Sequence, residues 1–209
     1  MKAKPVVELI EGQVGAIEVR HQAGTATKEG APVKLVVLSH PHPLFEGTMN
    51  NKVVTTMERA FHSLGYVTVA YNFRGVGQSE GEYDNGVGEV LDLQAVTDWA
   101  RDFYQATHVT LASFSFGSYV SLKAIKTMQV DALCTVAPPV GLYDFTDIHL
   151  VNVPWIMVQG GEDEVVSAPE ILQWAMSGEI QPDLYWRAGA SHFFHGELIW
   201  LKKIILMNY

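Results

Sequence analysis

The sequence predicts an α/β protein with a mainly parallel central sheet, helices on both faces and an antiparallel edge. Short apolar runs such as Lys34–Ser39 and Tyr66–Tyr71 alternate along the chain with segments of helical periodicity, which is typical of buried parallel strands and their crossover helices. Two segments before this series, Val6–Ile10 and Ala16–His21, are joined by a glycine-containing turn and predict a hairpin.

The remaining elements follow in turn after the hairpin. Strands are expected at residues 34–39, 66–71, 109–112, 132–137, 155–159 and 184–187. Helices are expected at residues 51–64, 90–104, 115–128, 169–176 and 197–207. The first helix stops at Gly65, because glycine favours the C-cap position. The second helix places four apolar residues on one face: Leu93, Val96, Ala100 and Phe103.

Composition and charge narrow the class of protein. The chain has 209 residues, of which 48% are hydrophobic, and this suits a single domain spanning residues 1–209. Its net charge of −9 disfavours a nucleic-acid partner, because phosphate binding requires a basic surface. No apolar run approaches the roughly 20 residues of a membrane span, and the N-terminus lacks the apolar region of a signal peptide. We therefore expect a cytoplasmic, soluble protein with no membrane partner, and the single cysteine, Cys134, fits a reducing compartment.

Residues that can do chemistry follow three of the predicted strands. Ser115 follows the strand at 109–112, Asp163 follows the strand at 155–159, and His192 follows the last strand. The carboxyl ends of parallel strands meet at one edge of the sheet, where ligands bind. A serine hydroxyl becomes a good nucleophile when a base removes its proton, so this set favours nucleophilic catalysis.

Alternatives exist for each of these residues. The stretch S-F-S-F-G at 113–117 departs from Gly-x-Ser-x-Gly at Ser113, so an ordinary strand–helix turn with Ser115 as N-cap stays open. His195 competes with His192 as the base. Four other acids lie beside Asp163 or after the sixth strand: Glu162, Glu164, Asp144 and Asp147.

Three longer stretches resemble a known family. Residues 40–53 read HPHPLFEGTMNNKV, residues 72–81 read NFRGVGQSEG and residues 192–196 read HFFHG. Together they resemble a group of compact bacterial α/β-hydrolases, with Glu46 standing where the group's pattern has glycine. The resemblance covers about residues 5–209 and implies an α/β-hydrolase fold and serine hydrolase activity. Most members of the group have no assigned substrate.

The resemblance also implies a role for each candidate. Ser115, Asp163 and His192 occur in the chain order expected of α/β-hydrolases. Ser115 is the expected nucleophile and His192 the general base and then acid, while Asp163 orients His192 and stabilises its imidazolium. The family pattern places the acid three residues after the strand-ending glycine, Gly160, which selects Asp163.

The oxyanion hole of such an enzyme needs two backbone N–H groups. One is expected from Phe116, the residue after the nucleophile. The other comes from the loop after the strand at 34–39, where Pro41 and Pro43 have no N–H and leave His42 or Leu44. Analogy with the fold favours His42.

We expect no cofactor and no metal. His40 and His42 are too few ligands for a metal site, and no cysteine or carboxylate cluster lies near them in sequence. The glycines of residues 74–81 match neither G-x-G-x-x-G nor a P-loop, so we expect a rigid turn in which Arg74 pairs with Glu80 or the sheet end.

The expected substrate is a small acyl compound. Only residues 138–154, which include three prolines, separate the strands at 132–137 and 155–159, so we expect no cap domain and an open site. Candidates for an apolar pocket wall are Phe45, Leu142, Tyr143, Phe145, Phe193 and Phe194. Such a site suits small carboxylic esters or thioesters, cleaved through an acyl-enzyme intermediate.

Other functions and partners stay open at this point. A peptidase or amidase would use the same triad, and a non-catalytic binding protein would keep the fold without the chemistry. The C-terminal helix carries the apolar run Ile204–Met207, which either packs wholly against the sheet or contributes to a homodimer.

Overall fold

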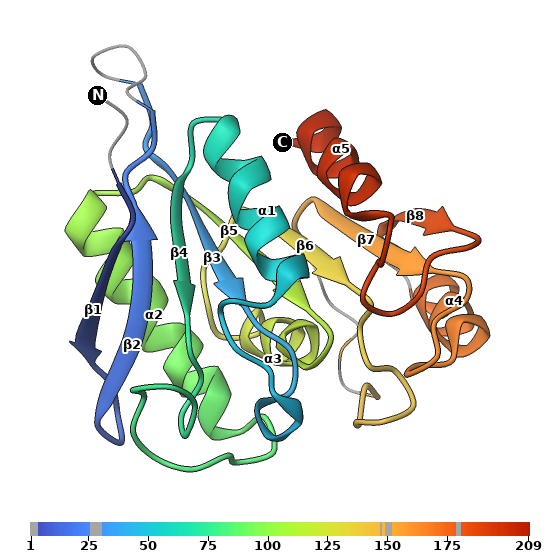
Figure 1. Ribbon diagram of the computed structural model, residues 1–209, viewed down its shortest axis with the longest axis horizontal. Helices are drawn as coiled ribbons and strands as arrows, with labels where there is room; N and C mark the ends of the chain where they lie inside the picture. The colour runs from blue at the N-terminus through green and yellow to red at the C-terminus, as the bar shows by residue number, and fades with distance from the viewer. Residues whose placement is uncertain (1–3, 26–30, 147, 149–151, 179–180) are drawn as a thin grey trace.

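A computed structural model gives the structure of the protein and describes residues 4–25, 31–146, 148, 152–178 and 181–209. A central sheet lies between two layers of helices (Figure 1). Its strands are β1 (Val6–Glu11), β2 (Ala16–Gln22), β3 (Lys34–Ser39), β4 (Val67–Tyr71), β5 (His108–Phe114), β6 (Ala132–Val136), β7 (Trp155–Gly160) and β8 (Asp183–Arg187). The helices are α1 (Lys52–Ser63), α2 (Gly88–Tyr104), α3 (Phe116–Ala124), α4 (Ala168–Ser177) and α5 (Leu198–Asn208), with a 3-10 turn, η1, at Pro43–Phe45.

The order of the strands confirms the predicted fold class. The described residues form an eight-stranded sheet in the order β1-β2-β4-β3-β5-β6-β7-β8. The hairpin strands β1 and β2 pair antiparallel, as do β2 and β4, and every pairing from β4 to β8 is parallel. The carboxyl ends of β3 to β8 therefore lie at the same edge of the sheet, where the loops that follow them can meet.

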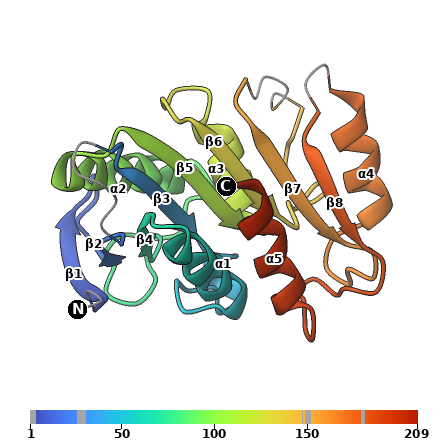
Figure 2. The same cartoon turned by 90° about the horizontal axis from the view of Figure 1, so that it is seen from above.

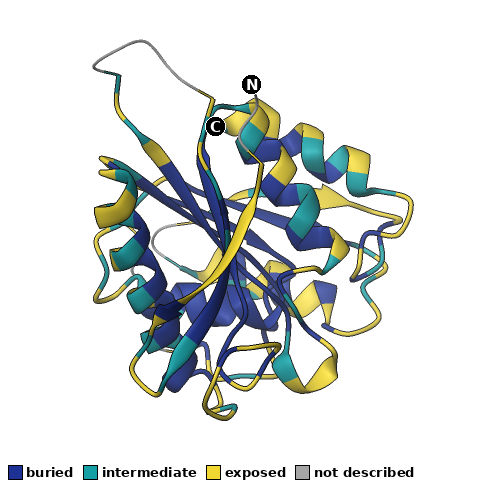
Figure 3. Cartoon of the chain, turned by 60° about the vertical axis from the view of Figure 1, so that its left-hand side comes forward, coloured by how far each residue is buried: buried dark blue, intermediate teal, exposed yellow. Residues whose placement is uncertain are grey.

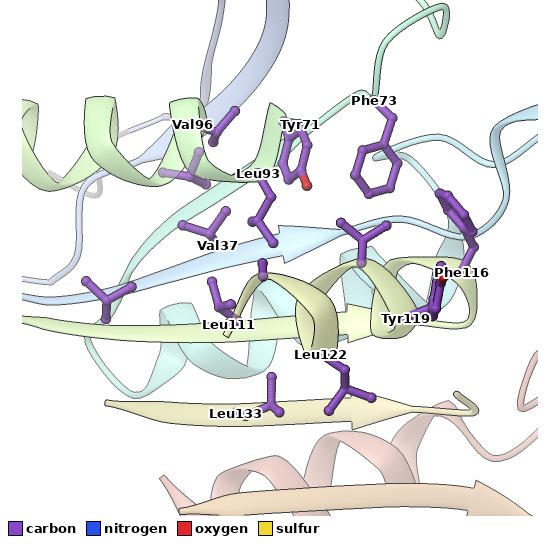
Figure 4. Close-up of a cluster of buried hydrophobic side chains, with 14 of the residues drawn as sticks. Val37, Tyr71, Phe73, Leu93, Val96, Leu111, Phe116, Tyr119, Leu122 and Leu133 are labelled. Carbon is purple, nitrogen blue, oxygen red and sulfur yellow. The ribbon is translucent and has the colours of Figure 1, made fainter. Parts of the chain in front are cut away.

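The core has one layer on each face of the sheet. Along β3, Leu35 and Val37 pack toward α2 and α3, whereas Val36 and Leu38 pack toward α1 and α5. Figure 4 shows the first layer, in which Val37 and Leu111 of the sheet meet Leu93 of α2. Viewed from above, α1 and α5 lie on one side of the sheet and α2 and α3 on the other (Figure 2). This double cover explains why β3 has no polar alternation in the sequence.

Exposure is concentrated on the hairpin edge and the outer faces of the helices (Figure 3). Edge strand β1 is exposed except at Ile10, whereas β4, β6 and β7 are buried throughout. On α5, Leu201 and Ile205 are fully buried while Ile199 and Met207 are 73% and 75% exposed, so this helix packs against the sheet with one face.

Two helices differ in detail from the prediction. In α2, Leu93, Val96 and Ala100 are buried, but Phe103, in the last turn of the helix, is 59% exposed. Its ring stacks on Trp99 and meets the ring of His21 in β2 edge-on. Helix α3 ends at Ala124 rather than at Met128. The N–H groups of Thr127 and Met128 both bond to the Ala124 carbonyl, which closes the helix in turns.

Among the residues that the structure describes, no cap domain covers the carboxyl edge of the sheet. Where the structure describes the 138–154 segment, it consists of turns and an isolated bridge between Val140 and Tyr143, without a helix. In the described part of the chain, no helix has the length and apolar character needed to cross a bilayer.

Candidate active site

Ser115 occupies a strained turn between β5 and α3. Its backbone has φ 53° and ψ −121°, a conformation that L-residues rarely adopt and that costs about 1–3 kcal/mol. Two hydrogen bonds hold this turn: the Ser115 N–H donates to the Val136 carbonyl at 2.8 Å, and the Ser115 carbonyl accepts from the Ser118 N–H at 2.7 Å. The side chain is thereby lifted out of the strand at the carboxyl edge of the sheet, and the residue is 7% exposed.

The two small residues beside Ser115 meet different constraints. A Cβ on Gly117 would lie 2.6 Å from the Ser39 carbonyl oxygen and 2.7 Å from that of His40, so only glycine lets α3 approach the end of β3. Ser113 is fully buried within β5, and its hydroxyl donates to the Cys134 carbonyl at 3.4 Å. The sheet therefore accommodates the hydroxymethyl group of Ser113, two residues before Ser115. At Gly117, two residues after it, any side chain is excluded.

The three side chains singled out from the sequence lie in one hydrogen-bonded chain. His192 Nε2 is 3.0 Å from Ser115 Oγ, and His192 Nδ1 is 2.9 Å from Asp163 Oδ2. The side chains of His192 and Asp163 are 2% and 0% exposed. In the neutral form of His192, the Nδ1–H donates a hydrogen bond to the Asp163 carboxylate, which leaves Nε2 as the acceptor that faces the serine hydroxyl.

Asp163 is held as a carboxylate by several donors. Burial raises its pKa, but the hydrogen bond with His192 and the N–H groups of Val166 and Val165 outweigh burial and bring the pKa below its usual value. Both N–H groups bond to Oδ1 at 2.9 Å, and Gln159 Nε2 donates to Oδ2 at 3.0 Å. The acid is therefore ionised and fixed in orientation at neutral pH.

The competing residues lie elsewhere or make other contacts. Glu164 Oε2 accepts from the backbone N–H of His192 at 3.0 Å, so it anchors the loop and not the ring. Glu162 and His195 are exposed, and Asp144 bonds to Thr146.

One further candidate acid, Asp147, lies outside the described residues.

The loop after β3 is built around two histidines with different partners. His40 is fully buried, and its Nε2 accepts from the Phe73 N–H at 3.0 Å, so its proton sits on Nδ1 and donates to the Pro41 carbonyl at 2.6 Å. His42 Nδ1 accepts from the Leu44 N–H at 3.1 Å. Burial lowers the pKa of both imidazoles, that of His40 to about 3.

These contacts bear on the expected oxyanion donors. The Leu44 N–H is already bonded to the ring of His42. Within the described part of the chain, neither the His42 N–H nor the Phe116 N–H makes a hydrogen bond to a protein acceptor. Phe116 is the first residue of α3, where the helix dipole favours negative charge. Of the two loop candidates, His42 is therefore the one whose N–H remains available to a ligand.

A pocket of about 500 Å³ opens beside Ser115 and His192. Its other lining residues are Pro41, His42, Phe45, Glu46, Asn51, Val165 and Phe193. Two of the predicted wall residues, Phe45 and Phe193, line it, whereas Phe145 and Phe194 are buried in the core.

Glu46 has φ 59° at the end of η1, a left-handed conformation that glycine adopts without strain. This left-handed conformation explains why the pattern of the group that the chain resembles has glycine at the position of Glu46.

The sequence did not single out two residues that shape the site. The first, Gln159, donates to Asp163 Oδ2. Asn51 caps α1 through the Val53 N–H and lines the pocket, and its position before an apolar periodic segment was the available signal.

The predicted pairing of Arg74 with Glu80 is wrong. Arg74 makes a two-pronged ion pair with Asp92 of α2 at 2.8 and 3.0 Å, and Glu80 instead accepts from the Ala16 N–H. Asn72 bridges the Met49 N–H and the Glu18 carboxylate, so the 72–81 loop is a structural turn tied to α2 and β2.

Comparisons with known proteins show which proteins the chain is similar to. Residues 18–153 match the family described as X-Pro dipeptidyl-peptidase (S15 family). An uncharacterized protein of Rickettsia prowazekii is 36% identical over 193 residues, which are 88% of this chain and 79% of that protein.

Two solved structures are similar over nearly the whole chain. An α/β serine hydrolase homologue from Coxiella burnetii has 43% identity and a TM-score of 0.91, covering 97% of this chain and 96% of that one. A protein from Xanthomonas campestris, described as an α/β serine hydrolase without lid, has 36% identity and a TM-score of 0.90, covering 98% of this chain and 93% of that one.

Proposed function

The chain belongs to the X-Pro dipeptidyl-peptidase family (S15 family), and we propose that it cleaves small carboxylic esters or thioesters. It is a serine hydrolase of the α/β-hydrolase fold. The proposed catalytic residues are Ser115, His192 and Asp163. The observation that carries the proposal is the continuous chain of hydrogen bonds from Asp163 through His192 to Ser115. A buried carboxylate, an imidazole and a strained serine in this arrangement have the geometry of an activated nucleophile.

The proposed reaction has two halves. His192 Nε2 takes the proton of the Ser115 hydroxyl as Oγ attacks the acyl carbon, and it then gives that proton to the leaving alcohol or thiol. This step breaks the ester bond and leaves an acyl group on Oγ. His192 then deprotonates a water molecule, which attacks the acyl group and displaces Oγ. The carboxylic acid is released, and His192 returns the proton to Ser115 Oγ.

The tetrahedral intermediates of both halves carry a negative charge on the former carbonyl oxygen. We assign the stabilisation of this charge to the N–H groups of Phe116 and His42. The first lies at the N-terminus of α3, and the second belongs to the loop that lines the pocket beside Ser115. Asp163 contributes by holding His192 in the required tautomer and by stabilising the imidazolium.

The shape of the site favours small acyl groups. The pocket holds about 500 Å³, and the described part of the 138–154 segment places no helix over it. Phe45, Val165 and Phe193 give it apolar walls. An ester or thioester of modest size fills such a pocket without needing a cap to bury a long chain.

The family match favours a peptidase as the second candidate function. The same three residues would cleave an amide, provided that His192 protonates the leaving amine. The two functions differ in the substrate and not in the nucleophile, so a direct comparison of substrates separates them.

The test is a panel of p-nitrophenyl esters and thioesters of increasing acyl length, measured beside X-Pro p-nitroanilides. We expect the wild type to hydrolyse short-chain esters with the highest kcat/KM. Ser115→Ala should lower kcat by at least about 10³-fold, because the nucleophile is lost. His195→Ala is the matched control for His192→Ala, since His195 is exposed and lies three residues away.

Two outcomes would contradict the proposal. Faster cleavage of the anilides than of every ester would favour the peptidase. Equal rates from the wild type and Ser115→Ala would point to a non-catalytic binding protein that keeps the fold.

A further inference from the structure

His40 is a buried, polar residue to which the proposed reaction gives no task. It lies directly after β3, is 0% exposed and has both ring nitrogens in hydrogen bonds with the backbone. Since a buried imidazole is costly to place among apolar side chains, its contacts should account for its presence.

The partners of His40 fix its tautomer and its orientation. The Phe73 N–H can only donate, so Nε2 must accept and the single proton of the neutral ring lies on Nδ1. That proton is directed at the Pro41 carbonyl, 2.6 Å away. The imidazole also packs edge-on against Phe73, at 4.6 Å between ring centres.

The Pro41 carbonyl belongs to the same peptide plane as the His42 N–H. The described residues contain no cis peptide bond, so the C=O and N–H of this peptide point in opposite directions. Holding the carbonyl toward the buried ring of His40 therefore turns the N–H of His42 away from the core. Both Pro41 and His42 line the pocket that contains Ser115.

We propose that His40 is a positioning residue that sets the oxyanion hole: its Nδ1–H holds the Pro41 carbonyl so that the His42 N–H faces the oxygen of the substrate bound at Ser115. This inference rests on the proposed serine hydrolase function. The hydrogen bond also polarises the peptide and strengthens the N–H as a donor.

The same cluster ties the two halves of the oxyanion hole together. Phe73 contacts His40 on one side and Phe116 on the other, at 4.6 and 5.7 Å between ring centres. The His40 carbonyl oxygen would be 2.7 Å from a Cβ on Gly117, so the loop and the start of α3 are in close contact. A shift of the Pro41–His42 peptide would therefore misalign one donor against the other, and a misalignment of about 1 Å is enough to cost activity.

A matched pair of substitutions separates the two contacts of His40. In His40→Asn, the side-chain amide lies near the place of Nδ1 and can still donate to the Pro41 carbonyl. In His40→Gln, the amide lies near the place of Nε2, so it can accept from the Phe73 N–H but no longer reaches the carbonyl in the same way. A role limited to packing and stability predicts the same kinetics for the folded fraction of both variants.

We expect His40→Gln to lower kcat by up to about 10²-fold with KM nearly unchanged, and His40→Asn to recover most of that loss. The inhibition constant of a trifluoromethyl ketone, which forms an anionic tetrahedral adduct on the serine, should rise in His40→Gln by a factor similar to the loss in kcat. Equal kcat for both variants, or a loss confined to KM, would overturn the inference.

A second pair covers the case in which His40→Gln does not fold. His42 has φ −54°, which suits proline, so His42→Pro removes the N–H while His42→Ala removes only the ring. We expect a kcat about 10²-fold lower for His42→Pro than for His42→Ala. Equal kcat values would show that the His42 N–H is no oxyanion donor and would overturn the role of His40.

The wild type separates this inference from the function on which it rests. A wild type that hydrolyses no ester or thioester would overturn the proposed function and this inference together. An active wild type with indistinguishable variants would overturn the inference alone.

Discussion

Two loops at the carboxyl edge of the sheet each carry a buried histidine, and the two histidines differ in the kind of partner they have. His40, after β3, bonds to a backbone N–H and a backbone carbonyl. His192, after β8, bonds to the Asp163 carboxylate and the Ser115 hydroxyl. The residues are 0% and 2% exposed, so burial alone does not distinguish them. The two histidines therefore differ in their partners, and the roles proposed for them, scaffold for His40 and acid and base for His192, follow from that difference.

The physical difference lies in charge. The backbone partners of His40 carry no net charge, and burial outweighs the hydrogen bond with the Pro41 carbonyl and lowers the pKa of the ring to about 3. His192 has an ionised carboxylate at 2.9 Å, which can stabilise the positive charge that forms when the ring takes a proton. His40 therefore stays neutral throughout the physiological range, whereas the proposed mechanism has His192 take up and release a proton.

The largest predicted effect comes from removing that charge. Asp163→Asn gives His192 an uncharged partner, as His40 has, and it also permits the wrong tautomer of the ring. We expect kcat to fall by about 10⁴-fold, measured on the best ester of the panel.

Glu162→Gln, one residue away and exposed, is the control and should retain activity. A fall in kcat of less than 10-fold in Asp163→Asn would mean that the charged partner of His192 is not what sets its role apart from that of His40.

An intermediate effect is expected in the pH dependence of stability. The folded-state pKa of His40 lies near 3, below the 6.5 of an unperturbed histidine, so the unfolded chain binds a proton that the folded protein refuses. The stability contributed by neutral His40 is complete above pH 6.5 and is lost as the pH falls toward 3. Across this window the free energy of unfolding of the wild type should fall by about 1.4 kcal/mol per pH unit relative to His40→Gln.

Urea unfolding of both proteins between pH 4 and pH 7 measures this difference. Parallel pH profiles would contradict the assignment of His40 as a neutral scaffold.

The smallest predicted effect concerns the serine that His192 faces. Ser115→Ala and Ser115→Gly both remove the hydroxyl, but the backbone φ of 53° strains alanine and not glycine. We expect Ser115→Gly to be more stable than Ser115→Ala by about 1 kcal/mol in urea unfolding. A more stable alanine variant would indicate that the turn relaxes and that the strain is not held by the fold.

The sequence was informative wherever a local pattern determines the structure. The alternation of apolar runs with helical segments predicted the parallel sheet, and parallel strands necessarily bring the loops of Ser115, Asp163 and His192 to one edge. The choice of Asp163 over Glu164 followed from the family pattern, and the structure places the Glu164 carboxylate on the backbone of His192.

The rest depends on distances in space. The partner of Arg74 proved to be Asp92 of α2, because the loop is folded back toward that helix. In the same way, the tautomer of His40 is set by the N–H of Phe73, far from it in the chain, and no local signal in the sequence announces that contact.

We propose that Ser115 is an activated nucleophile because Asp163 orients His192 and stabilises the charge that the ring gains, whereas His40 has only backbone partners. Intact-protein mass spectrometry after incubation with a fluorophosphonate tests it most directly. We predict one adduct per chain on Ser115, formed readily by the wild type and His195→Ala, absent in Ser115→Ala and slowed at least about 10²-fold in Asp163→Asn. No adduct on the wild type, or an adduct at another residue, would show that Ser115 is not the activated nucleophile.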